Sequence, residues 1–187
     1  MKRKTISVSC FAIIVVVAGG LCLSGTIRAQ TGVADNPHLR ATPQANAAAT
    51  KLTDKDKKFI QEAANGGVAE VADGKLAEER GQSAEVKKIG ARMVADHSKA
   101  NNELVELAKK KGLGIDLSKG KPRNFSQDRF DGQYLASMES DHKTDISAFE
   151  KEASSGDDAD LKAWAAKTLP TLKAHLAMVR EAMKKKK

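Results

Sequence analysis

Residues 83–112, SAEVKKIGARMVADHSKANNELVELAKKKG, begin with a serine, end with a glycine and contain no proline. This spacing of serine and glycine is the usual capping asymmetry of an α-helix. Between the two ends, one helical face recurs at three- and four-residue intervals. Its members are Val86, Gly90, Met93, His97, Asn101, Leu104 and Ala108. The stretch therefore predicts an amphipathic helix with a histidine at its midpoint.

Three further segments also begin at a possible helix-capping residue, and two of them end at or before a glycine. One begins at Thr53 and stops at Gly81, one begins near residues 124–126 and stops before Gly156, and one begins at residue 157 or 158 and runs to the C-terminal lysines. None shows the strict apolar–polar alternation of a β-strand. Four helices of about 27 residues predict an all-α, antiparallel four-helix bundle. We place this domain at residues 53–183.

The connection between the second and third predicted helices is long for a helical bundle. It covers residues 112–125 and contains three glycines and Pro122. Fully extended, about fourteen residues reach roughly 46 Å, more than the roughly 40 Å length of a 27-residue helix. The connection could cross the whole bundle, as in ferritin-like folds with one long crossover, or it could fold back on itself.

The N-terminal 29 residues have the layout of a secretory signal peptide. Lys2, Arg3 and Lys4 precede an apolar run at residues 6–23, and turn-forming residues lead to Ala29. Cleavage there predicts an exported protein, with the periplasm as its compartment. If the segment stays uncleaved, the apolar run would be an N-terminal membrane anchor. Residues 30–52, rich in Ala, Thr, Asn, Gln and Pro, predict a flexible linker that could act as a tether.

The formal net charge of +8 is concentrated at the two ends of the chain. Four basic and no acidic residues lie in the first 29 positions, and four more basic residues end the chain. The body between them is balanced and poor in aromatic residues, unlike a nucleic-acid-binding domain. Nucleic acid is therefore not an expected partner. A weak contact with an anionic envelope surface could come from Lys184, Lys185, Lys186 and Lys187.

Four polar side chains lie near the middle of the predicted helices, on or beside the apolar stripes: Glu70, His97, His142 and His175. Residues at helix midpoints lie at a similar position along the long axis of the bundle, whether a helix runs up or down. We therefore expect these four side chains to converge inside the bundle. Three imidazoles and one carboxylate could hold zinc, iron, manganese or copper. The alternative is a structural network in which the histidines and Glu70 hydrogen-bond across the core.

The frame Met-x-x-Asp-His occurs at residues 93–97 and again at 138–142. Glu139 and His142 also have the Glu-x-x-His spacing of di-iron bundles. Val94 and Leu172 stand where the matching glutamates of the second and fourth helices would be, so a full di-metal carboxylate site is not predicted. The residues that could support a site are Asp96, Asn101, Tyr134, Glu139, Asp141 and Asp145.

Two features of the predicted helices run against helix propensity. Gly66, Gly67 and Gly74 lie inside the first helix, where each costs about 1 kcal/mol relative to alanine. We expect them to allow close approach of a neighbouring helix, or to leave space for a bound group. Pro170 lies inside the fourth helix and predicts a kink just before His175.

Four motifs in order resemble a bacterial family of domains of unknown function, whose members are exported and labelled as outer membrane proteins. The resemblance covers residues 54–182 and implies a ferritin-like four-helix bundle and no established reaction. The motifs are AANGGVAEV (63–71), RMVADHSKAN (92–101), FDGQYLASMESDH (130–142) and LPTLKAHL (169–176). They match the family at Glu70, His97, Asn101, Tyr134, His142, Pro170 and His175.

These observations are compatible with three functions. The first is an exported binding or stress-related bundle with a structural polar core. The second is a metal-binding or metal-dependent redox protein that uses the Glu/His cluster. The third is a tethered envelope-interaction protein. No catalytic triad order, phosphate loop or glycosidase carboxylate pair marks an enzyme, so we lean toward a binding protein.

Overall fold

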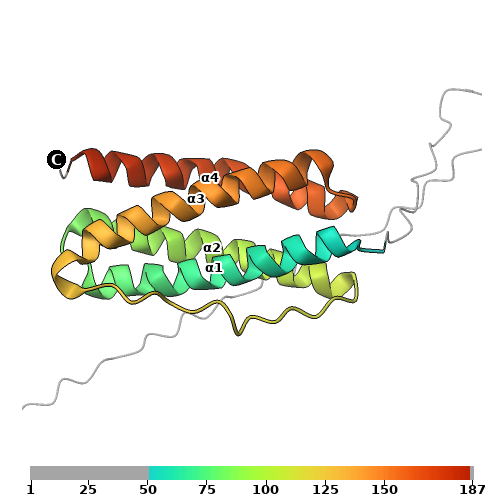
Figure 1. The fold of residues 1–187 in the computed structure, drawn as a ribbon, viewed down its shortest axis with the longest axis horizontal. Coiled ribbons are helices and arrows are strands. Elements are labelled where there is room, and N and C mark those ends of the chain that lie inside the picture. Colours follow the sequence, from blue (N-terminus) through green and yellow to red (C-terminus); the bar gives the residue numbers. More distant parts are fainter. Residues whose placement is uncertain (1–50, 186–187) are drawn as a thin grey trace, which may run out of the picture. The chain divides into compact units, whose positions relative to one another are not determined.

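The computed structural model describes residues 51–185, which form a four-helix bundle (Figure 1). The helices are α1 (Asp54–Arg80), α2 (Ala84–Lys110), α3 (Phe130–Ser155) and α4 (Ala159–Lys184), with a short 3-10 helix, η1 (Gln127–Arg129), before α3. The predicted all-α four-helix bundle is confirmed. The predicted signal segment, residues 30–50 of the predicted linker and the last two lysines lie outside the described residues.

The helices begin where local side chains satisfy the free backbone N–H groups of the first turn. Thr53 caps α1, Ser83 caps α2 and Asp158 caps α4, each through side-chain oxygen. α3 has no side-chain cap, and the 3-10 turn delays its start to Phe130, later than predicted.

The segment between α2 and α3 crosses the bundle along α1 (Figure 1). Near the start of α1, Gln61 Nε2 donates to the carbonyl of Asp116 at 2.5 Å. Near the end of α1, Arg80 Nη2 donates to the carbonyl of Phe125 at 2.8 Å. The chain therefore advances along α1 from one end to the other, and α2 and α3 point the same way. Of the two alternatives left open by the sequence, the crossover is the one adopted.

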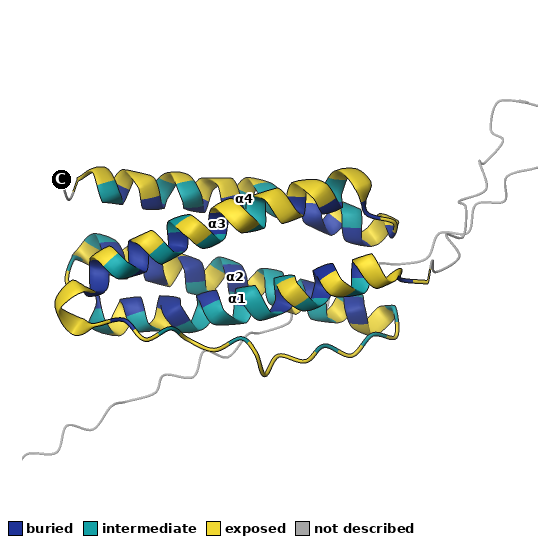
Figure 2. Ribbon diagram, in the orientation of Figure 1, coloured by how far each residue is buried: buried dark blue, intermediate teal, exposed yellow. Residues whose placement is uncertain are grey.

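The packing pairs are antiparallel: α1 with α2, α3 with α4, α1 with α3 and α2 with α4. Buried residues face the centre of these pairs (Figure 2). They form two apolar clusters, one near each end of the bundle. Phe59, Phe149 and Trp164 contact one another in the first cluster, and Phe130 stacks on Tyr134 in the second. The middle of every helix lies between these clusters.

The edges of the bundle differ slightly from the predicted boundaries. Leu52, assigned to the end of the linker, is buried in the first apolar cluster. Lys184, assigned to the basic tail, is the last residue of α4. Within residues 51–185, no helix is both long enough and apolar enough to cross a membrane.

Two glycines allow α1 and α2 to approach closely. A Cβ added to Gly90 would lie 2.6 Å from the carbonyl oxygen of Gly74 and 2.8 Å from Ala77 Cβ. The neighbour is backbone, which cannot rotate away as a side chain can. Close packing, the use expected for Gly74, is therefore confirmed. At Gly66, by contrast, an added Cβ meets nothing within 4 Å.

We expect Gly90→Ala to lower the free energy of unfolding by about 1–2 kcal/mol, because overpacking outweighs the gain in helix propensity. Gly66→Ala is the matched control and should stabilise the protein by up to about 1 kcal/mol. Urea unfolding of both variants at pH 7 measures the difference. Equal effects of the two substitutions would contradict the close contact.

Candidate metal centre

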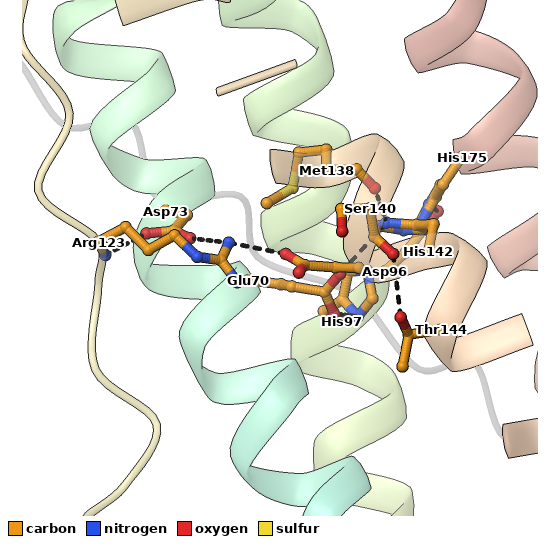
Figure 3. A network of polar contacts seen from close by, with 11 residues as sticks. Glu70, Asp73, Asp96, His97, Arg123, Met138, Ser140, His142, Thr144 and His175 are labelled. Carbon is orange, nitrogen blue, oxygen red and sulfur yellow. Dashed lines mark hydrogen bonds and ion pairs between the residues drawn. The ribbon is translucent and has the colours of Figure 1, made fainter. Parts of the chain in front are cut away.

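Glu70, His97, His142 and His175, one from each helix, meet in the middle of the bundle (Figure 3). All four residues are buried, with 0–5% of their surface exposed. One ring nitrogen from each histidine lies within 4.8 Å of the other two. The structure thus brings together the four side chains that the midpoints of the predicted helices singled out.

His142 has a defined tautomer. Its Nδ1 lies 3.0 Å from the backbone carbonyl oxygen of Met138, one turn earlier on α3. A carbonyl oxygen only accepts hydrogen bonds, so Nδ1 carries the proton and donates it. In a neutral imidazole this leaves a lone pair on Nε2.

His175 has the opposite tautomer. Its Nε2 lies 2.8 Å from Asp96 Oδ2. Burial opposes ionisation of Asp96, but hydrogen bonds from His175 and Arg92 outweigh it and lower the pKa of this carboxyl group. Asp96 is therefore a carboxylate and accepts the Nε2–H of His175. In a neutral ring, the lone pair of His175 is then on Nδ1.

These two lone pairs face each other. His142 Nε2 and His175 Nδ1 are 3.1 Å apart. Burial, and then the neighbouring His175, lowers the pKa of His142 to about 4, and burial also lowers the pKa of His175. Both rings are therefore neutral near pH 7, with no proton to share between the two nitrogens. A cation held between them would remove the repulsion.

His97 follows the same pattern. Its Nδ1 lies 3.1 Å from Glu70 Oε2. Burial, and then His142 and His175, lowers the pKa of His97 to about 3, so this ring is also neutral. Its Nε2 is buried and has no hydrogen-bond partner within residues 51–185. Each histidine thus has one outer nitrogen next to an oxygen atom and one inner nitrogen without a proton donor.

Glu70 lies between two of the rings. Besides the contact with His97, its Oε1 is 3.2 Å from His142 Nδ1 but forms no hydrogen bond in the described part of the chain. The pKa of Glu70 is raised well above its usual value, first by burial and then by Asp145 and Asp141. A cation in the centre would favour its ionised form.

Arg123, on the crossover, neutralises carboxylates beside the centre (Figure 3). Its Nη1 lies 2.9 Å from Asp73 Oδ2 and 2.7 Å from Asp141 Oδ2, and its backbone N–H donates to Asp73 Oδ1 at 2.7 Å. Asp73 is fully buried and one turn after Glu70 on α1. The crossover is therefore tied to the helices that carry Glu70 and His142.

Two of the proposed supporting residues contact residues other than the histidines. Glu139 forms ion pairs with Lys143 at 2.8 Å and Arg180 at 3.1 Å on the outside of the bundle. Tyr134 is fully buried in the second apolar cluster, and burial raises its pKa. Asn101 and Asp145, in contrast, line a small cavity that also borders His97.

Four parts of this region were not predicted from the sequence: Arg123, Asp73, Trp164 and the carbonyl of Met138. Asp73 had a usable signal, since it lies three residues after Glu70 and so on the same face of α1. The others had none, because a crossover arginine, a lone tryptophan and a backbone carbonyl acquire their roles from residues distant in the sequence.

The chain was compared with known protein families, curated proteins and solved structures. Residues 41–182 match the family described as a domain of unknown function, DUF4142. No curated protein and no solved structure was found to match the chain. The matched region contains α1, α2, α3 and nearly all of α4, with Glu70 and the three central histidines, and covers most of the 187 residues. The protein therefore belongs to the DUF4142 family.

Proposed function

We propose that this protein binds one transition-metal ion through the inner nitrogens of His97, His142 and His175. The observation that carries the proposal is the 3.1 Å approach of His142 Nε2 to His175 Nδ1, with both protons directed outward. Neutral imidazoles with free lone pairs are the form in which histidine binds metals.

The outer contacts support this assignment. Histidines that bind metals usually donate their other N–H to a carboxylate or a backbone carbonyl, which fixes the tautomer and the ring orientation. Here Glu70, the Met138 carbonyl and Asp96 lie against the outer nitrogens of His97, His142 and His175. A structural polar core would also be expected to satisfy the inner nitrogens, whereas His97 Nε2 has no hydrogen-bond partner within residues 51–185.

The donor set suits zinc, copper, iron or manganese, with imidazole favouring the first three. Nitrogens bound tetrahedrally to zinc at about 2.0–2.1 Å are roughly 3.3 Å apart. One ring nitrogen from each histidine lies within 4.8 Å of the other two, and the inner nitrogens of His142 and His175 are 3.1 Å apart. Small rotations of the rings would bring them to the distances that a metal requires. Glu70 serves as the partner of His97 in this arrangement, or as a further ligand through Oε1.

In this proposal the site belongs to an exported protein. The support is the N-terminal sequence, with its basic start, its apolar run and the turn-forming residues that follow. A binding or stress-related role outside the cytoplasm is compatible with a buried metal centre. The structural polar network is the competing function, and it predicts no metal uptake.

The test is metal titration of the protein purified without a histidine tag and stripped with a chelator. We expect one Co²⁺ per chain, with the visible d–d absorption of a nitrogen-coordinated ion. His142→Gln should weaken binding at least about 100-fold, since a first ligand is lost. His38→Gln is the matched control, because His38 lies in the predicted linker at residues 30–52.

Absence of uptake by the unaltered protein would exclude this function. So would equal affinities of the unaltered protein and His142→Gln. In either case the histidines would be assigned to a structural network.

A further inference from the structure

The metal centre proposed above is buried, so an ion must reach it through one side of the bundle. Its three histidines and Glu70 are only 0–5% exposed. Of the three outer partners, Glu70 and Met138 are buried as well, whereas the side chain of Asp96 is 22% exposed. Asp96 is therefore the residue at which the centre meets solvent.

The other sides of the bundle are closed by packing. The two apolar clusters lie toward its ends. α1 and α2 approach each other closely at Gly74 and Gly90. The crossover runs along α1, and its Arg123 binds carboxylates of both α1 and α3. On the outside, an ion pair at 3.1 Å between Glu139 and Arg180 links α3 to α4. This leaves the face between α2 and α4.

Two surface grooves lie on the α2–α4 face, and Arg92 lines both of them. The first has a volume of about 260 Å³ and is also lined by Lys88, Ala174 and His175. The second has a volume of about 240 Å³ and contains Asp96. Each groove is several times larger than a water molecule, which leaves room for a metal ion with part of its hydration shell.

Arg92 and His175 donate to the same oxygen atom of Asp96. Arg92 Nε lies 2.5 Å from Oδ2, and His175 Nε2 lies 2.8 Å from it. The other oxygen, Oδ1, has no hydrogen-bond partner within residues 51–185. Arg92 is one turn before Asp96 on α2, and its side chain is 59% exposed. It can therefore move into solvent without any movement of the helices.

We propose that a divalent metal ion enters the centre across the α2–α4 face, with Asp96 as its first protein ligand and Arg92 as the group that it displaces. The inference rests on the proposed function, and it adds the route to that site and the residue that controls the route. Carboxylate oxygens bind hydrated divalent ions, and imidazole nitrogens suit transition metals. The ion thus passes from an oxygen ligand at the surface to nitrogen ligands in the interior.

An ion on Asp96 also releases His175 from its fixed orientation. The cation repels Arg92 and competes with the Nε2–H of His175 for Oδ2. The ring then turns about its side-chain torsions and presents Nδ1 to the ion. Once the ion lies between the imidazoles, Asp96 again accepts a hydrogen bond from Nε2, and Arg92 covers the carboxylate.

Rates of metal uptake and release by the full chain test this route. Metal-free protein is mixed with Co²⁺ in a stopped-flow spectrometer, and release is followed after an excess of EDTA is added. Entry and exit share one path, so a change at Arg92 alters both rates by a similar factor. Arg92→Met should accelerate both by about three- to fivefold, because the ion no longer has to displace an exposed ion pair.

Lys88→Met is the matched control for the loss of charge. Lys88 lines the same groove as Arg92, but the ion pairs of Asp96 in the described part of the chain are with Arg92 and His175. A charge at the rim of a site acts mainly on the rate of association. We therefore expect uptake by Lys88→Met to change by less than about twofold, and release to stay unchanged.

A second pair of variants obstructs a groove. Ala174 is exposed and lies beside His175 in the wall of the first groove. Ala174→Trp should slow uptake and release by about tenfold and keep the stoichiometry of the unaltered protein. Ala136→Trp is the control, since Ala136 is exposed on α3 and lines a different groove next to η1. Its rates should equal those of the unaltered protein.

The outcomes separate the route from the site. Unchanged rates in Arg92→Met, or an equal acceleration of uptake and release in Lys88→Met, overturn the role of Arg92. Unchanged rates in Ala174→Trp, or equal slowing in Ala136→Trp, overturn entry across the α2–α4 face. In each of these cases the metal site itself stands. Failure of the unaltered protein to take up Co²⁺ overturns both proposals.

Discussion

Zinc added to the metal-free protein should raise its free energy of unfolding by about 4 kcal/mol when free zinc exceeds the dissociation constant a thousandfold. The reason is that α2, α3 and α4 each supply one imidazole, so the three inner nitrogens come together only in the folded bundle. An ion that binds the folded state alone stabilises it by mass action. Urea unfolding at pH 7.5 with and without zinc measures the effect.

Variants of the centre give this prediction its controls. His175→Ala should remove nearly all of the stabilisation by zinc, since a ligand is lost. Asp96→Asn should weaken zinc binding by about 10–100-fold, because the amide is a poorer acceptor for the Nε2–H of His175. Asp128→Asn, an exposed position on η1, should behave like the unaltered protein. Equal stabilisation of His175→Ala by zinc would contradict the assignment.

Arg123→Met should lower the free energy of unfolding by roughly 2–3 kcal/mol. The substitution leaves Asp73, which is fully buried, and Asp141 without their shared cation. Breaking a fully buried ion pair costs about 3–5 kcal/mol, and we expect less here because the Arg123 side chain is 37% exposed. The Asp73 carboxylate keeps its hydrogen bond from the backbone N–H of residue 123.

Arg129→Met is the matched control for this experiment. Arg129 is exposed on η1, and its loss should change the free energy of unfolding by less than about 0.5 kcal/mol. Adding Asp73→Asn to Arg123→Met should restore part of the stability, because the uncompensated carboxylate is gone. If Arg123→Met is as stable as Arg129→Met in urea, the crossover is not anchored by this ion pair.

The local sequence was sufficient to predict the helices and to place the site near the middle of the bundle along the helix axes. Helical periodicity shows which residues share a face, and caps such as Thr53 and Ser83 show where a helix starts. Midpoints of helices in a bundle lie near one another whatever the order of packing. For this reason Glu70, His97 and His142 could be placed together before their contacts were known.

Only the tertiary structure decided the path of residues 112–125 and the chemistry inside the bundle. The length of the crossover allowed two paths, and contacts with α1 that are distant in the sequence, such as that of Arg123 with Asp73, favour one of them. Tautomers depend on the atom opposite each ring nitrogen. Asp96, next to a histidine on α2, directs its carboxylate to His175 on α4, which periodicity within one helix cannot encode.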